Sequence, residues 1–194
     1  MSEKRNEFND ISDRDLYLSM YSSQFILLIA SVVILVTFSS SPIRFLLSIE
    51  LHWLSGLWQG LLFALSALLI NAALYQLLPR TFLDDGGLNE RVFKHMGFVH
   101  IVLFCLVVAV VEEWLFRAVL QQLFGLPIAS LLFALVHFRY LRKPVLFSYV
   151  LFISVALGLL YERTNNLAAV IIAHFLSNTV LALIMRYKTA KTKP

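Results

Sequence analysis

Six apolar stretches follow one another along this chain of 194 residues, each ended by prolines, glycines or charged residues. They span approximately residues 21–38, 54–78, 98–124, 127–138, 145–161 and 166–185. A helix needs about 20 apolar residues to cross the hydrocarbon core of a bilayer, and backbone polar groups at that depth must pair within the protein. The sequence therefore predicts an all-α fold, a polytopic transmembrane helix bundle of about six spans, in which 127–138 is short for a span.

The composition agrees with a membrane protein and excludes an ordinary soluble domain. Hydrophobic residues make up 59% of the chain and charged residues only 14%, which leaves too little polar surface to cover a soluble fold. The single cysteine, Cys105, excludes an intramolecular disulfide framework and a cysteine-based zinc site.

The basic residues alternate between the segments that would connect the spans. With six spans and both termini in the cytoplasm, the cytoplasmic segments would hold 13 of the 16 lysines and arginines. These are Lys4, Arg5, Arg14, Arg80, Arg91, Lys94, Arg139, Arg142, Lys143, Arg186, Lys188, Lys191 and Lys193. Arg44 and Arg163 would lie outside, and Arg117 within the membrane. This distribution satisfies the positive-inside rule, so we interpret the positive charge as topology control, with no nucleic acid as a partner.

Four segments follow from this reading. We expect a polar cytoplasmic arm over 1–20, N-terminal membrane helices with a loop over 21–97, a catalytic membrane domain over 98–186, and a basic cytoplasmic tail over 187–194. The expected location is a cell membrane, as a multi-pass protein, in a bacterium.

Ionisable residues inside the third stretch point to a functional site. Glu112, Glu113 and Arg117 interrupt an otherwise uncharged run, and each such residue costs at least ~2.5–3.5 kcal/mol on insertion scales. Glu113 and Arg117 are four residues apart, so they share a helix face and can form an ion pair. Glu112 lies about 100° away around the helix, which leaves it without a local partner.

Two later stretches also carry polar side chains at helical spacing. Phe133 and His137 are four residues apart in one, and His174 and Asn178 are four residues apart in the other. A single histidine or asparagine in a membrane usually serves an interhelical hydrogen bond. Here three helices together offer a carboxylate, two imidazoles and a carboxamide, which suits general acid–base chemistry.

These residues resemble the three motifs of the CAAX protease and bacteriocin-processing (Abi) family. The segments Glu112-Glu-Trp-Leu-Phe-Arg117, Phe133-Ala-Leu-Val-His137 and His174-Phe-Leu-Ser-Asn178 are similar, in order, to E-E-x-x-x-R, F-x-x-x-H and H-x-x-x-N/D. The segment beginning at Gly158 also looks typical of the family. Ala118 departs from it, because many members have glycine after the motif arginine.

The resemblance implies a glutamate-type intramembrane endopeptidase that uses no metal or other cofactor. Glu112 and His137 would activate a water, and His174 and Asn178 would stabilise the tetrahedral oxyanion. Glu113, Arg117 and Phe133 would support that geometry. The implied partners are a membrane-associated protein or peptide substrate and the lipid bilayer.

Two alternatives remain open at this point. Glu112, His137 and His174 could form a two-histidine, one-carboxylate zinc site. The chain could also be a non-catalytic membrane scaffold, or an immunity or regulatory protein of the same family, that binds a partner membrane protein.

Overall fold

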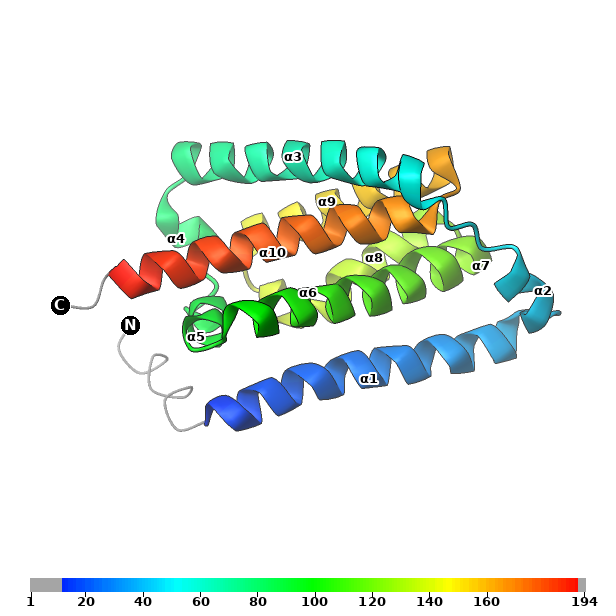
Figure 1. The fold of residues 1–194 in the computed structure, drawn as a ribbon, viewed down its shortest axis with the longest axis horizontal. Coiled ribbons are helices and arrows are strands. Elements are labelled where there is room, and N and C mark those ends of the chain that lie inside the picture. Colours follow the sequence, from blue (N-terminus) through cyan, green and yellow to red (C-terminus); the bar gives the residue numbers. More distant parts are fainter. Residues whose placement is uncertain (1–11, 192–194) are drawn as a thin grey trace.

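The computed structural model describes residues 12–191, and these form a bundle of helices that run roughly along one long axis (Figure 1). The elements are α1 (Asp13–Phe38), α2 (Pro42–Leu47), α3 (Trp53–Leu77), α4 (Arg80–Leu83), α5 (Leu88–Lys94), α6 (Phe98–Glu113), the π-helix η2 (Trp114–Gln121), α7 (Gln122–Phe124), α8 (Leu126–Val136), the 3-10 turn η3 (Phe138–Tyr140), α9 (Pro144–Thr164) and α10 (Leu167–Lys191).

The predicted all-α membrane fold is confirmed, with no strand among the described residues. Five helical segments are long and apolar enough to cross a membrane: Asp13–Phe38, Trp53–Leu77, Phe98–Phe124, Pro144–Thr164 and Leu167–Lys188. The sixth predicted span is α8, which has 11 residues. At 1.5 Å per residue α8 is about 16 Å long, roughly half the thickness of the hydrocarbon core.

The first helix begins earlier than the sequence suggested. The Ser12 side chain accepts a hydrogen bond from the Asp15 backbone N–H, and Asp13 and Asp15 place negative charge in the first turn, so α1 starts at Asp13. Leu16 is buried against Val92 and Met96 near α5. Residues 13–20 of the predicted polar arm are therefore part of α1, while residues 1–11 lie outside the described residues.

Two positions with positive φ reverse the chain between membrane helices. Gly125 (φ 84°) separates α7 from α8, and Asn165 (φ 46°) separates α9 from α10. Glycine and asparagine tolerate this conformation better than other residues do. Asn166 then ties the start of α10 to the α2–α3 connection, because its side chain accepts from the His52 N–H at 3.0 Å and donates to the His52 carbonyl at 2.9 Å.

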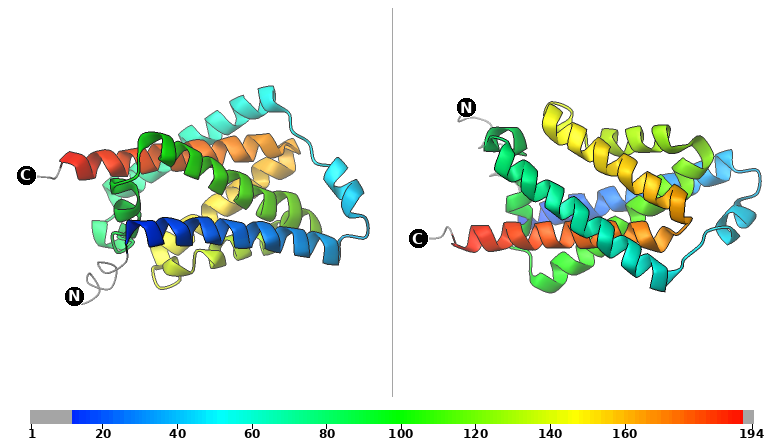
Figure 2. Two further views of the ribbon diagram at one scale, coloured as in Figure 1. Left: turned by 60° about the horizontal axis from the view of Figure 1, so that its bottom comes forward. Right: turned by 90° about the horizontal axis from the view of Figure 1, so that it is seen from above.

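Helix α10 lies at the centre of the bundle and packs against α3, α6, α5 and α9 (Figure 2). Its closest approach is to α3, where the buried residues are Gly56, Gly60, Ala64 and Ala67. The facing residues of α10 include Ala168 and Ala169, both fully buried. Apolar side chains gain nothing by leaving lipid tails, so small residues that let backbones approach provide the packing between membrane helices.

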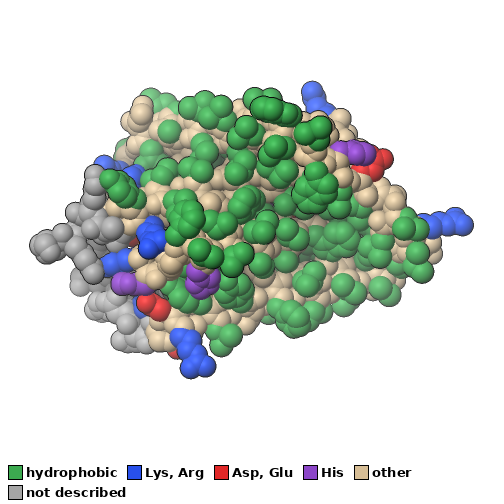
Figure 3. Space-filling model, in the orientation of Figure 1, with side chains coloured by type: hydrophobic (Ala, Val, Ile, Leu, Met, Phe, Trp, Pro, Cys, Tyr) green, Lys and Arg blue, Asp and Glu red, His purple; other side chains and the backbone are tan. Residues whose placement is uncertain are grey.

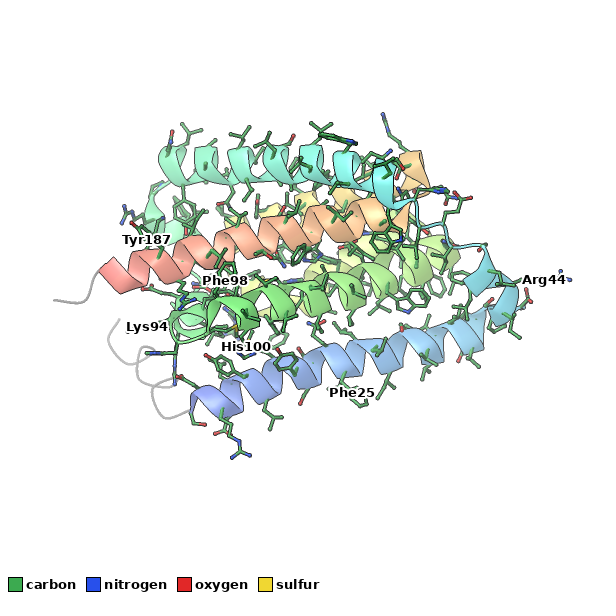
Figure 4. All side chains as sticks on the ribbon, viewed as in Figure 1. Phe25, Arg44, Lys94, Phe98, His100 and Tyr187 are labelled. Atoms are coloured by element: carbon green, nitrogen blue, oxygen red, sulfur yellow. The ribbon has the colours of Figure 1, made fainter. Side chains whose placement is uncertain are left out.

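The surface has the pattern of a protein embedded in a bilayer. In Figure 3 hydrophobic side chains cover the middle of the visible face, and charged side chains gather toward the two ends of the long axis. Figure 4 places Arg44 at one end and Lys94 at the other, with Phe25 pointing away from the bundle between them. Phe25 is 63% exposed, which is unfavourable in water and favourable in lipid.

We predict that Gly60→Ala destabilises the bundle by pushing α3 away from α10. A Cβ at Gly60 would lie 2.8 Å from the Ala169 carbonyl oxygen and 2.8 Å from the Ile172 Cβ, neither of which can move without its helix. Overpacking of this kind costs about 1–3 kcal/mol. Thermal unfolding of purified protein in detergent measures the effect. Gly97→Ala is the matched control, because a Cβ there meets open space, and equal stability of the two variants would contradict the prediction.

Candidate active site

The glutamate pair sits where the third membrane helix changes its geometry. Glu112 and Glu113 end α6, and the next eight residues form the π-helix η2, which contains Arg117. Every residue from Leu115 to Gln121 is buried, so this wider turn lies inside the bundle on all sides. Segments of π-helix are rare and occur frequently at functional sites.

Glu113 is the centre of a buried ion-pair network. Its Oε2 accepts from Arg117 Nε at 3.0 Å, and its Oε1 accepts from His174 Nδ1 at 2.7 Å. Glu113 and Arg117 have no solvent exposure. Arg117 also donates from Nη2 to Ser154 Oγ of α9 at 2.9 Å. The predicted Glu113–Arg117 pair is confirmed, and the network joins α6, η2, α9 and α10.

Glu112 has no local partner, as expected from the sequence, but two residues of other helices lie close to its carboxyl group. Its Oε1 accepts a hydrogen bond from Gln24 Nε2 of α1 at 3.2 Å, and its Oε2 lies 4.0 Å from His174 Nε2. Glu112 as a whole residue is 6% exposed. Helical spacing could not reveal Gln24, because the contact joins residues 88 positions apart in the chain.

His137 lies just beyond the C-terminal end of α8, and Phe133 stands between it and the glutamate centre. The His137 Nδ1–H donates to the Phe133 carbonyl at 2.8 Å, which leaves Nε2 as the available nitrogen of the neutral imidazole. The Phe133 ring centroid lies 4.9 Å from that of His137, 6.2 Å from that of His174 and 5.4 Å from Arg117 Cζ.

The structure thus brings some of the expected site residues together directly and others through a neighbour. Glu112, Glu113, Arg117 and His174 form one contiguous cluster. His137 reaches this cluster through the Phe133 ring, with no direct contact to Glu112 among the described interactions. Asn178 is partly buried one helical turn beyond His174 on α10.

Gly158 lets α9 approach the buried arginine. A Cβ at this position would lie 3.3 Å from Arg117 Nη1 and would overlap the side chains of Leu126 and Gln121. The Gly158 carbonyl also accepts from Gln121 Nε2 at 2.9 Å. This close approach is the physical reason for a glycine at the start of the segment that the sequence analysis singled out.

Asp85 of the α4–α5 connection and Asn89 of α5 form a clasp around the turn that follows His137. Arg139 donates to Asp85 Oδ2 at 3.1 Å, and Asn89 donates from Nδ2 to Tyr140 Oη at 3.1 Å. The Tyr140 ring stacks on the His137 ring with 6.2 Å between centroids. The sequence analysis did not predict these contacts, because they join residues 54 and 51 positions apart in the chain.

An apolar pocket lies close to the glutamate pair along the chain, although neither glutamate lines it. It has a volume of about 540 Å³ and lies among α1, α3, α6 and α10, with Val111 and Trp114 in its wall directly next to Glu112 and Glu113 in the chain. Every side chain that lines it is apolar or aromatic.

A zinc site at this centre would use Glu112, His137 and His174 as its ligands. Among residues 12–191, no group of three or more histidine, cysteine, aspartate or glutamate side chains has the arrangement to hold a metal ion. His174 uses Nδ1 for Glu113, and His137 uses Nδ1 for a backbone carbonyl.

The arrangement of these side chains suits proton transfer. One buried carboxylate, Glu112, faces an imidazole whose other nitrogen is fixed by a second carboxylate, Glu113. An imidazole oriented in this way can hold or donate a proton at Nε2, and a carboxylate can serve as a base. Fold and site together define a helical membrane protein with a buried carboxylate–imidazole centre.

Comparison with known proteins agrees with this class. The family profile described as "Type II CAAX prenyl endopeptidase Rce1-like" matches residues 94–180, a range that contains all three motifs. The chain is 42% identical over 132 residues to "Uncharacterized protein YpbD" of Bacillus subtilis (strain 168), which covers 68% of this chain and 70% of that protein. No solved structure matches the chain. The chain belongs to the Rce1-like family of the CAAX protease and bacteriocin-processing proteins, as its motifs predicted.

We predict that Glu113→Gln lowers the stability of the folded protein strongly. The change keeps the volume of the side chain but leaves Arg117 as a buried charge without its counter-ion, a loss of about 3–5 kcal/mol for a buried pair. Thermal unfolding in detergent measures it. Glu162→Gln, the same change at an exposed position of α9, is the control.

The double variant Glu113→Gln/Arg117→Met should recover part of the lost stability, because it removes both charges together. A Glu113→Gln variant that unfolds at the wild-type temperature would contradict the importance of this pair.

Proposed function

We propose that the protein is an intramembrane endopeptidase that hydrolyses a peptide bond in a membrane-associated protein or peptide. The observation that carries the proposal is the buried centre in which Glu112 faces His174 across 4.0 Å while Glu113 holds the same imidazole at 2.7 Å. Membership of a family described as prenyl endopeptidase-like supports the reaction class.

In the proposed reaction Glu112 acts as the general base. It takes a proton from a water molecule as the water oxygen attacks the scissile carbonyl carbon, and it later delivers that proton to the leaving amine. His137 assists in orienting the water through Nε2, the nitrogen left available by its bond to the Phe133 carbonyl. Since catalytic contacts often tighten only with substrate bound, its present separation from Glu112 is compatible with this role.

His174 and Asn178 are proposed to stabilise the oxyanion of the tetrahedral intermediate. A doubly protonated His174 donates Nδ1–H to Glu113 and directs Nε2–H toward the reacting carbonyl, and the Asn178 amide adds a second donor. Such protonation would also balance the buried charges, because Glu112 and Glu113 together exceed Arg117 by one negative charge. Glu113 and Arg117 hold the imidazole in place, and no metal or other cofactor takes part in the proposal.

The substrate class follows from the surroundings of the site. The apolar pocket of about 540 Å³, whose wall includes Val111 and Trp114 next to the glutamate pair in the chain, can accept an apolar segment of a substrate that resides in the bilayer. The peptide bond would then reach the carboxylate without leaving the membrane.

The proposed location is a bacterial cell membrane with both termini in the cytoplasm. The start of α1 and the end of α10 lie at the same end of the bundle, as an even number of crossings requires (Figure 1). That end also carries α4 and α5 (Figure 1), whose connection binds Arg139 and Lys143, whereas Arg44 lies at the opposite end (Figure 4). The positive-inside rule then places the clasp on the cytoplasmic side.

Glu112→Gln should abolish cleavage of a membrane-anchored reporter by the purified protein while leaving it folded. Glutamine keeps the volume and the hydrogen bonding but cannot act as a base, so the rate should fall at least ~10²-fold. Glu162→Gln should cleave like the wild type. Cleavage by Glu112→Gln within a few-fold of wild type would refute the assignment.

The same assay separates the alternatives. Activity lost with a chelator and restored by zinc would favour a zinc enzyme. A wild-type protein without activity, together with a Glu112→Gln strain of normal phenotype, would favour the scaffold. Comparative proteomics of wild-type and Glu112→Gln strains should reveal the substrate as an uncleaved membrane protein or peptide.

Cysteine labelling should establish the orientation in the membrane. In a Cys105→Ser background, a cysteine at Phe138, which is 71% exposed beside His137, should react with an impermeant thiol reagent in inverted vesicles but not in intact cells. A cysteine at Ile43, 73% exposed at the opposite end, should show the reverse. A cysteine at Ala134 should not react from either side, because that residue is fully buried. Labelling of Phe138→Cys from outside the cell would overturn the proposed topology.

A further inference from the structure

One side chain from outside the family-matched region enters the candidate site. Gln24 belongs to α1, whereas the match to the Rce1-like profile covers only residues 94–180. It is 8% exposed, and its Nε2 donates to Glu112 Oε1 at 3.2 Å. Since none of the three motifs contains this residue, its role has to be argued from the structure.

The other end of the same carboxamide is unsatisfied. Gln24 Oε1 is fully buried and has no hydrogen-bond partner. A buried acceptor without a donor is costly, and few such groups occur in native proteins. α1 is already anchored by other means, including packing near Leu16 and the hydrogen bond from Trp114 Nε1 to Ser31 Oγ at 3.0 Å. Attachment of α1 therefore does not account for a glutamine at position 24.

A carboxamide can hydrogen-bond a carboxyl group in both of its protonation states. Its N–H donates to an ionised carboxylate, as Gln24 does in this structure, and its carbonyl oxygen accepts from the O–H of a protonated carboxyl. Rotation of the amide by half a turn exchanges the two atoms. A base that takes up a proton and then returns it needs support in both states, and the unpaired Oε1 is the acceptor for the protonated one.

We infer that Gln24 is a positioning residue for Glu112. It holds Glu112 Oε1, the oxygen that takes the proton from the attacking water, in both protonation states, so that Oε2 stays directed toward His174 Nε2. This inference rests on the proposed function, because it assigns Gln24 a part in the proton transfer carried out by Glu112. It also makes α1 a part of the catalytic unit, although α1 lies outside the matched region.

The first test replaces Gln24 by methionine, which preserves length and removes both hydrogen-bonding atoms. Misplacement of a catalytic group can cost ~10²-fold, so we expect kcat for the membrane-anchored reporter to fall ~10–100-fold with KM changed less than about threefold. Gln122→Met is the matched control, because Gln122 donates to Tyr161 Oη at 2.6 Å and makes no contact with the glutamate pair. Ser31→Ala is the control for looser docking of α1.

The second test replaces Gln24 by glutamate, which is isosteric but places a second carboxylate beside Glu112. The other charged and titratable groups at this centre are Glu113, Arg117 and His174. In the Gln24→Glu variant the two adjacent carboxylates at positions 24 and 112 favour sharing one proton. That shared proton restores a hydrogen bond between the two side chains. Activity of Gln24→Glu relative to wild type should therefore rise as the pH is lowered, whereas the ratio for Gln24→Met should stay level.

The outcomes distinguish the inference from the proposed function beneath it. An active wild type, an inactive Glu112→Gln variant, and a Gln24→Met variant with reduced kcat support the inference. If Gln24→Met keeps the wild-type kcat, or if Ser31→Ala lowers kcat by as much as Gln24→Met does, the inference is overturned and the proposed function stands. An inactive wild type overturns the proposed function and the inference with it.

Discussion

The buried carboxylate of Glu113 makes the contacts on which the rest of this structure depends. It binds Arg117 through one oxygen and His174 through the other, and both it and Arg117 are sealed from solvent. Removing Glu113 or Arg117 alone would leave an uncompensated charge at membrane depth, which is far more costly than the pair itself. The network therefore requires α6, η2, α9 and α10 to meet at one point, and it leaves Glu112 beside an imidazole whose orientation is already set.

The apolar helices around this centre have to bring their backbones close without help from the hydrophobic effect. Small residues make this possible at two places: Gly56 and Gly60 of α3 lie against α10, and Gly158 of α9 lies against Arg117 and Gln121. In the first case close packing holds two helices together, and in the second it makes room for a long charged side chain. The π-helical segment lies in this closely packed region, and all its residues from Leu115 to Gln121 are buried.

Much of the fold and part of the site could be predicted from local pattern. Runs of apolar residues identified the membrane helices, since a bilayer permits only internally paired backbone. Spacing of four residues predicted the Glu113–Arg117 pair, which the structure confirms. Hydropathy alone began α1 too late, although the Ser12 cap and the acidic first turn mark its start locally. The contact of Glu112 with Gln24 was not predicted, because these residues are 88 positions apart in the chain. The clasp of Asp85 and Asn89 around the turn after His137 was missed for the same reason.

The sequence by itself determined that this is a helical membrane protein with ionisable groups in three of its helices, since hydropathy and helical periodicity are properties of neighbouring residues. Only the tertiary structure decided which of these groups meet. It placed His174 between the two glutamates, moved His137 behind Phe133, and brought Gln24 from the first helix to Glu112. The physical reason is that contacts between helices depend on crossing geometry and on where small residues allow close approach, and neither is encoded in the period of a single helix.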